Sequence, residues 1–210
     1  MTAIRVTLLG EGPTDRRLLP IIEWTLLERS GQTVVHAFAD LGFLDPRPST
    51  LGERIAAALE FFPCDILCVH RDADRASRVE RRTEILGAMP KVDDQSVVCV
   101  IPVRAQETWL LIDEVAIRKA ARRPGGREPL GLPRPRNLER LADPKRLLRA
   151  AIRTATGLRG RRLTRFDLGA ALARLPYLIE DFRPLRQLPA FRAVEGELSA
   201  ALRGLGDGAP

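Results

Sequence analysis

Aromatic residues, cysteines, histidines and long apolar runs are all scarce in this chain of 210 residues, and each scarcity excludes a class of protein. Aromatic residues make up 5% of the chain, which argues against a module that stacks single-stranded bases on aromatic side chains. No segment approaches the roughly 20 apolar residues of a membrane-spanning helix. The apolar start, residues 4–10, is short and lacks the cleavage site of a signal peptide. We therefore expect a cytoplasmic protein that makes no membrane contact.

The few cysteines and histidines do not have the spacing of metal ligands. Cys64, Cys68 and Cys99 lie in or beside apolar segments and indicate reduced, partly buried thiols. The two histidines, His36 and His70, have no partner at the spacing of a zinc site. We expect His70, at the end of an apolar segment, to be a structural histidine whose hydrogen bonds are satisfied.

The charge of the chain is strongly positive. The formal net charge is +7, the isoelectric point is about 10.3, and arginine far outnumbers lysine. Arginine suits bidentate contact with phosphate, so this balance fits a nucleic-acid enzyme with cations around its cleft. The alternative is that an arginine-rich and alanine-rich composition only reflects a GC-rich bacterial genome.

Apolar segments of strand length alternate with segments of helical periodicity through the first part of the chain. Strands are expected at residues 4–10, 33–38, 66–70 and 97–103. Helices are expected at residues 16–30, 53–62 and 77–88 and from residue 105 onward. Thr50 and Glu53 form a capping box, and Pro20 predicts a kink or a late helix start. This order predicts an α/β fold, with a mainly parallel sheet and helices on both faces.

A change of composition at Arg122 suggests where the first domain ends. Residues 122–137 are rich in proline and glycine and predict a loop. Beyond it, helices are expected at residues 138–156, 167–174 and 190–205. We therefore expect an α/β domain at residues 1–121, a loop at 122–137, and a C-terminal helical extension at 138–205 that packs on the domain.

Carboxylates follow two of the expected strands. Glu11 comes directly after the first strand, and Asp72 and Asp74 come directly after the third. Loops that leave the carboxyl ends of parallel strands line one crevice, so these three side chains can converge. Clustered carboxylates repel one another unless a cation joins them, and oxygen ligands suit Mg²⁺ or Mn²⁺. The pattern therefore indicates metal-dependent chemistry on phosphate.

A Glu-Gly pair after the first strand and an Asp-x-Asp motif after a later one resemble the Toprim domain. That domain is shared by topoisomerases, bacterial primases and OLD-type nucleases. Two further segments, Ile101–Val103 with Glu107–Asp113, and then Asp143-Pro144-Lys145, resemble a Toprim-like bacterial family of unknown function. These later segments extend the resemblance across nearly the whole chain.

The resemblance implies roles for the acidic residues. Glu11 corresponds to the Toprim glutamate, a general acid/base or a metal ligand near the scissile phosphate, and is a candidate catalytic residue. Asp72 and Asp74 correspond to the metal-binding pair for Mg²⁺ or Mn²⁺. Glu107 is the candidate additional ligand for a second metal ion, and Asp113 is a weaker one.

Basic residues are the candidate contacts for phosphate. Arg75 follows the Asp-x-Asp motif directly, as a basic residue does in some Toprim enzymes. Lys145, Arg149 and Arg153 recur at four-residue spacing and are expected to share one helix face. Lys145 is the second catalytic candidate because it could reach the phosphate, and the two arginines could hold the nucleic-acid backbone.

The resemblance implies a metal-dependent nuclease that cleaves DNA or RNA, tRNA among the possible substrates. OLD-type nucleases carry a fused ATPase module, which this chain lacks, so a separately encoded ATPase partner and a role in anti-phage defence are implied. A homo-oligomer is also expected. Tyr177 is the only tyrosine and lies in the helical extension, so topoisomerase strand transfer is not expected.

Other interpretations of the same residues stay open. The chain could be a non-catalytic Toprim-like subunit that binds an ATPase or nucleic acid. An Asp-x-Asp phosphatase or nucleotide-sugar transferase is a third class, although Ala76 departs from the phosphatase motif and Glu11 is then unexplained. The same residues could also have structural roles only. Glu11, Asp72 and Asp74 would then be helix-end or turn residues, and Glu107 an acid in the first turn of a helix. The helix face of Lys145 would be a solvated surface.

Overall fold

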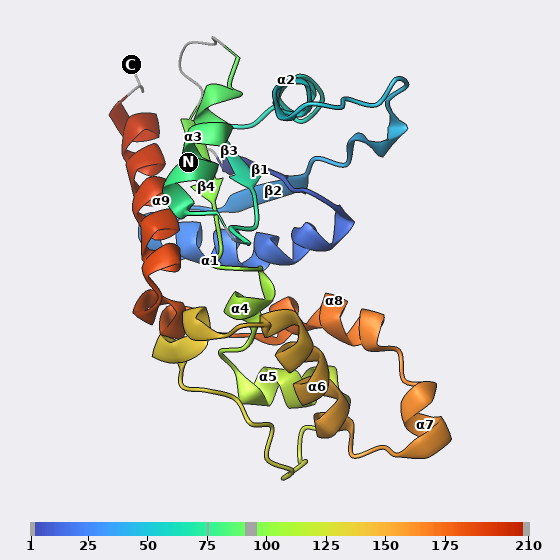
Figure 1. Cartoon of the computed structure of the whole chain (residues 1–210). Helices are drawn as coiled ribbons and strands as arrows, with labels where there is room; N and C mark the ends of the chain where they lie inside the picture. Colours follow the sequence, from blue (N-terminus) through green and yellow to red (C-terminus); the bar gives the residue numbers. More distant parts are fainter. Residues whose placement is uncertain (1–2, 75, 91–95, 208–210) are drawn as a thin grey trace. The chain divides into compact units, whose positions relative to one another are not determined.

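The chain forms two compact units (Figure 1), and the computed structural model describes residues 3–74, 76–90 and 96–207 of it. Unit 1 comprises Met1–Ile101 and Arg192–Pro210, and unit 2 comprises Pro102–Phe191. The chain leaves unit 1 after its fourth strand and returns to it within helix α9 (Pro189–Asp207). The boundaries expected at residues 121 and 137 both fall inside unit 2.

Unit 1 is built on a four-stranded, wholly parallel sheet, which confirms the predicted fold class. Strands β1 (Ile4–Leu9), β2 (Val34–Phe38), β3 (Ile66–His70) and β4 (Ser96–Val100) lie in the order β2-β1-β3-β4. Val6 of β1 is in register with His36 on one side and with Ile66 on the other. β4 ends three residues earlier than the sequence predicts, because the apolar run continues past the end of the ladder.

Helices connect the strands of unit 1 and cover both faces of the sheet. They are η1 (Pro13–Leu18), α1 (Leu19–Ser30), η2 (Leu41–Phe43), α2 (Leu51–Phe61) and α3 (Arg78–Gly87), followed after unit 2 by the remainder of α9. Figure 1 shows α1 and α2 on opposite sides of the strands. The predicted layering, with helices on both faces, is therefore present.

Local sequence signals explain where these helices begin and end. Pro20 lies in the first turn of α1, so the helix starts late, and a 3-10 turn precedes it. Gly31 ends α1 with φ at 64°, a conformation that glycine adopts at little cost. Before α2, the Thr50 hydroxyl accepts from the Glu53 N–H at 3.2 Å, and the Glu53 carboxylate accepts from the Thr50 N–H at 3.0 Å. The predicted capping box is therefore confirmed.

Alternating side chains divide the sheet into two buried faces. Leu9, Leu67 and Val69 share one face with Ile55 of α2 and Ile85 of α3, and all five are buried. The opposite face carries the alternate residues of the same strands, among them Val6, Leu8, Ile66 and Cys68. Burying one large aliphatic side chain stabilises a fold by about 1.5–3 kcal/mol, so these two faces contribute much of the stability of unit 1.

The outer edge of β4 is covered by a side chain of α9. The Glu197 carboxylate accepts from the backbone N–H of Cys99 at 2.8 Å. The same carboxylate pairs with Arg78 at 2.6 Å and with Arg82 at 3.3 Å, both on α3. An edge N–H that no strand pairs is thereby satisfied, which protects the edge from pairing with another chain.

Unit 2 consists of helices and loops. Its elements are α4 (Glu107–Leu110), α5 (Glu114–Ala120), η3 (Pro135–Arg140), α6 (Pro144–Thr156), α7 (Gly160–Thr164), α8 (Leu168–Leu178), η4 (Arg183–Gln187) and the start of α9. Trp109 is fully buried and meets Phe191 edge to face, with ring centroids 5.6 Å apart. The expected loop at residues 122–137 is present as far as Arg134, where η3 follows. Among the helices that the structure describes, none combines the length and apolarity that crossing a membrane requires.

Candidate metal centre and arginine pocket

The order of the strands places the loops after β1 and β3 at a switch point of the sheet. β1 and β3 are neighbours, and the chain continues from β1 to one side of this pair and from β3 to the other. In open parallel sheets such a point opens a crevice at the carboxyl ends of the strands, where ligands bind. Glu11 follows β1 and Asp72 follows β3, so both lie at this crevice.

Glu11 is held by the residues that leave β3. Its Oε1 pairs with Nε of Arg71 at 2.8 Å, and its Oε2 accepts from the backbone N–H of Asp72 at 3.3 Å. Arg71 also pairs with Glu84 at 2.7 Å. The Glu11 side chain keeps 39% of its exposure, so the carboxylate is oriented and yet open to a ligand.

Asp15 fixes the backbone on which Glu11 stands. Its Oδ2 accepts from the N–H of Glu11 at 2.7 Å and from that of Gly12 at 3.1 Å. The residue is buried, and a Cβ on Gly10 would lie 2.6 Å from the Asp15 Cβ. Gly10 is therefore required by this close approach, and Asp15 acts from the third position of η1.

His70, expected to be a structural histidine, turns one nitrogen to the carboxylates. Its Nδ1 lies 3.0 Å from the carbonyl oxygen of Val100, which can only accept, so Nδ1 carries a proton. Its Nε2 lies 3.4 Å from Oδ1 of Asp72 and 3.8 Å from Oδ2 of Asp15. The side chain is 1% exposed, and Nε2 has no hydrogen-bond partner among the described residues. This arrangement is typical of a metal-ligating histidine, whose other nitrogen donates to a carbonyl.

Charge around His70 also affects its protonation. Burial disfavours the charged imidazole, but the carboxylates of Asp72 and Asp15 and the Val100 carbonyl outweigh it. The pKa of His70 therefore lies above its ordinary value. A cation at Nε2 would take the place of this proton and balance the same two carboxylates.

Glu11, His70 and Asp72 together form a group that fits a divalent cation. One ligand atom from each lies within 4.8 Å of the other two. Asp72 and His70 are buried. Nε2 of His70 is a buried polar atom without a hydrogen bond to the described residues, and coordination of a metal ion would supply the missing interaction. Two carboxylates and one imidazole suit Mn²⁺ better than Mg²⁺, which prefers oxygen ligands alone.

The other half of the Asp-x-Asp motif lies outside this group. Asp74 is exposed in the turn after β3, with φ at 50°, and it is not one of the three clustered ligands. Arg75 lies outside the described residues. Arg81 supplies a cation here, since its Nε donates to the Asp72 carbonyl at 3.2 Å. Pairing with Glu84 foremost, and the charges of Glu11 and Asp74, hold the pKa of Arg81 above its ordinary value.

The remaining candidates from the sequence belong to unit 2. Glu107 is buried in the first turn of α4. Lys145, Arg149 and Arg153 are all exposed on α6, whose buried residues include Leu148. The predicted sharing of one helix face is thus confirmed, and that face is basic and open to solvent.

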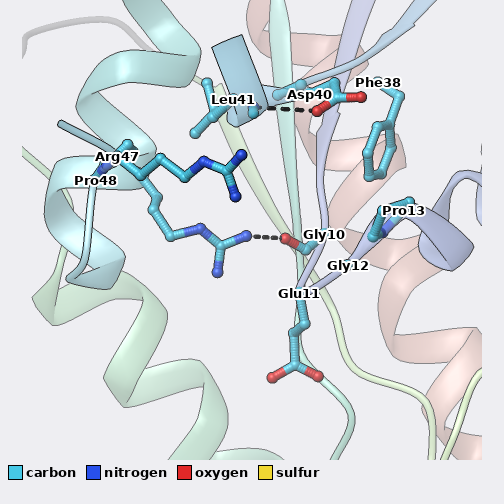
Figure 2. A pocket seen from close by; sticks show the side chains of 12 residues that line it. Gly10, Glu11, Gly12, Pro13, Phe38, Asp40, Leu41, Arg47 and Pro48 are labelled. Atoms are coloured by element: carbon cyan, nitrogen blue, oxygen red, sulfur yellow. Dashed lines mark hydrogen bonds between the residues drawn. The ribbon is translucent and has the colours of Figure 1, made fainter. Parts of the chain in front are cut away.

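A pocket adjoins Glu11 on the β2 side of β1 (Figure 2). It has a volume of about 440 Å³. Arg54 of α2 donates from Nη2 to the carbonyl oxygen of Gly10, and Arg47 extends into the pocket. Figure 2 shows the Glu11 carboxylate directed away from Arg47. The lining residues are Gly10, Glu11, Gly12, Pro13, Phe38, Ala39, Asp40, Leu41, Gly42, Arg47, Pro48 and Arg54.

Four contributors to this site were missed in the sequence: His70, Asp15, Arg47 and Arg54. His70 had one usable signal, because it ends the strand that Asp72 follows. Asp15 follows Glu11 at a spacing that places it in the first turn of the next helix. Comparison with protein-family models, with curated proteins and with solved structures gave no match for this chain. The evidence on function therefore comes from the residues of this chain and not from a relative.

Proposed function

We propose that unit 1 is a Toprim-like, divalent-metal-dependent phosphodiesterase that cleaves DNA or RNA. The observation that supports this most is the convergence of Glu11, His70 and Asp72, among whose ligand atoms the buried Nε2 of His70 makes no hydrogen bond to the described residues. Arginines surround the group, which is the charge pattern that a polyanionic substrate needs. Mn²⁺ is the preferred ion in this proposal, and Mg²⁺ is the second.

The residues of the site have separate roles in metal binding, proton transfer and positioning. His70 and Asp72 would hold the ion from the buried side, and Glu11 from the exposed side. When bound, a divalent ion polarises phosphoryl oxygens and makes a water molecule more acidic. Glu11 is the most exposed of the three, so its carboxylate is placed to accept a proton from an attacking water. Arg71 keeps that carboxylate oriented, and Asp15 keeps its backbone in place.

Other parts of the proposal come from the resemblance. The basic face of α6, with Lys145, Arg149 and Arg153, would contact the nucleic-acid backbone. A separately encoded ATPase would gate the activity in an anti-phage system.

A cleavage assay with matched variants tests the proposal. Supercoiled plasmid and bulk tRNA are incubated with the protein in Mn²⁺ or Mg²⁺, and Mn²⁺ binding is followed separately by electron paramagnetic resonance. We expect Glu11→Gln, His70→Gln and Asp72→Asn to lose cleavage by at least about a hundredfold, because each removes a ligand. We expect Mn²⁺ affinity to fall in His70→Gln and Asp72→Asn.

Two variants serve as controls. His36→Gln removes the other histidine, whose partner is Glu23 at 3.5 Å, and Asp181→Asn removes an exposed acid of unit 2. Both should retain full cleavage and full Mn²⁺ binding. Wild-type protein that binds no Mn²⁺, or cleavage that survives in Glu11→Gln and His70→Gln, would overturn the proposal. Mn²⁺ binding without cleavage, alone or with an ATPase, would favour the non-catalytic subunit instead.

A further inference from the structure

The two arginines of the pocket differ from most other arginines of unit 1 in having no ion pair with a carboxylate of the described residues. Arg5, Arg71, Arg78 and Arg82, for example, each pair with an acid within 3.3 Å. Neither Arg47 nor Arg54 has an ion pair among the residues that the structure describes. The two carboxylates that line the same pocket are engaged elsewhere, Asp40 with Arg16 and Glu11 with Arg71. An anion bound between the two guanidinium groups would therefore balance their charge.

A hydrogen bond to the backbone fixes the position of Arg54 at the pocket. Nη2 of Arg54 donates to the Gly10 carbonyl, which ties the guanidinium to the end of β1. Its remaining N–H groups keep the planar fork that matches phosphate oxygens. Arg47 is exposed and approaches from the loop after η2. Arg54 is thereby held at the end of β1, beside the crevice between β1 and β3.

The apolar walls of the pocket indicate which chemical groups are attached to the bound anion. Pro13, Phe38 and Leu41 supply apolar surface beside the arginines. A volume of about 440 Å³ lies within the range of small-ligand pockets and exceeds what an inorganic anion fills. A phosphate that carries a sugar and base fits both the charge and the apolar walls.

The position of Glu11 decides which phosphate is held. Glu11 lines the pocket and also belongs to the metal group, but its carboxylate points away from Arg47 (Figure 2). The arginines therefore face a different phosphate from the one at Glu11, His70 and Asp72. We infer that the pocket bounded by Arg47 and Arg54 binds a nucleotide phosphate, the one that flanks the cleaved phosphate in a nucleic-acid strand. This inference rests on the proposed function and adds a substrate-binding subsite to it.

The test measures binding without metal. A short fluorescein-labelled oligonucleotide, as DNA and as RNA, is titrated with the protein in EDTA, and anisotropy is recorded at several salt concentrations. We expect Arg47→Ala and Arg54→Ala each to weaken binding about tenfold, as loss of a charged hydrogen-bond partner does. The slope of log affinity against log salt should become shallower by about 0.7 for the lost phosphate contact.

Arg203→Ala is the matched control, because Arg203 is another exposed arginine of unit 1 with no ion pair among the described residues. It should change affinity by less than about twofold. Arg54→Lys keeps the charge but not the fork, and we expect an intermediate loss. Arg47→Ala removes an exposed side chain, so its result does not depend on folding. Equal affinity and equal salt slope in Arg47→Ala and Arg203→Ala would overturn the inference.

Competition with unlabelled ligands distinguishes a free nucleotide phosphate from a phosphate within a strand. Displacement of the probe by 5′-AMP from wild type but not from Arg47→Ala supports a pocket for a free nucleotide phosphate. Displacement by unlabelled strand alone supports the flanking position in a strand. Unchanged binding in Arg47→Ala with intact metal-dependent cleavage overturns only this inference. Arginine-dependent binding with no cleavage overturns only the proposed function.

Discussion

Replacing Gly10 by alanine should damage both the fold and the metal centre. The new Cβ would lie 2.6 Å from the Asp15 Cβ and 2.9 Å from Asp15 Oδ2. Non-bonded carbon atoms prefer about 3.5–4.0 Å, so Asp15 would have to retreat by about 1 Å. Its Oδ2 now accepts from the N–H groups of Glu11 and Gly12 at 2.7 and 3.1 Å, and such a shift breaks at least one of these bonds.

The expected loss of stability follows from these two effects. Overpacking costs about 1–3 kcal/mol, and loss of a hydrogen bond to a charged group costs about 1.5–3 kcal/mol. We expect Gly10→Ala to lower the free energy of unfolding by about 3 kcal/mol. Urea denaturation followed by far-UV circular dichroism measures it, and Mn²⁺ binding reports on Glu11 in the same samples.

Gly12→Ala is the control for this experiment. Gly12 lies two residues further on, has an extended backbone with φ at −156°, and has open space where a Cβ would stand. It should leave stability within about 0.5 kcal/mol of wild type. If Gly10→Ala is as stable as Gly12→Ala and binds Mn²⁺ equally well, the close approach of Asp15 does not position Glu11 and the reasoning is wrong.

Three further changes test the framework that carries the site. Glu197→Ala leaves the buried N–H of Cys99 without its acceptor and should cost about 1–3 kcal/mol in urea denaturation, while Glu197→Gln should retain most of the stability. Arg5 lowers the pKa of Asp65, so the stabilisation by this carboxylate is present above its ordinary pKa and is lost as pH falls through the lowered one. The stability difference between wild type and Asp65→Asn should therefore be about 0.5–1 kcal/mol near neutral pH and vanish in strong acid, and a constant difference would contradict the ion pair. Thr50→Ala removes the cap of α2 and should lower the thermal midpoint by the equivalent of about 1 kcal/mol, whereas Thr50→Ser should not.

Local signals were sufficient for most of the fold of unit 1. The apolar run of β3 and the capping box before α2 depend only on neighbouring residues, and both were predicted at the right positions. The approach of Glu11 to Asp72 was also predictable, because parallel strands bring their carboxyl ends to one edge. Each of these inferences needs only periodicity and chain direction.

The rest of the site depends on contacts that periodicity does not encode. Whether His70 faces a core or a carboxylate depends on what packs over the end of its strand, and here Asp15 of η1 does so. Arg47 and Arg54 come from a loop and a helix that only the folded chain brings to Gly10. The amphipathic pattern of α9 predicts a helix but not that it covers the edge of β4 through Glu197.

The return of the chain to unit 1 through α9 has a consequence for biosynthesis. During translation the four strands emerge first, then residues 102–191, and only afterwards the segment that supplies Glu197. Until that segment has left the ribosome, the N–H of Cys99 lacks its acceptor from α9, and the edge of β4 can pair with another nascent chain. We therefore expect the nuclease site proposed here to mature late, since the sheet that carries it is completed only after all of unit 2 has been made.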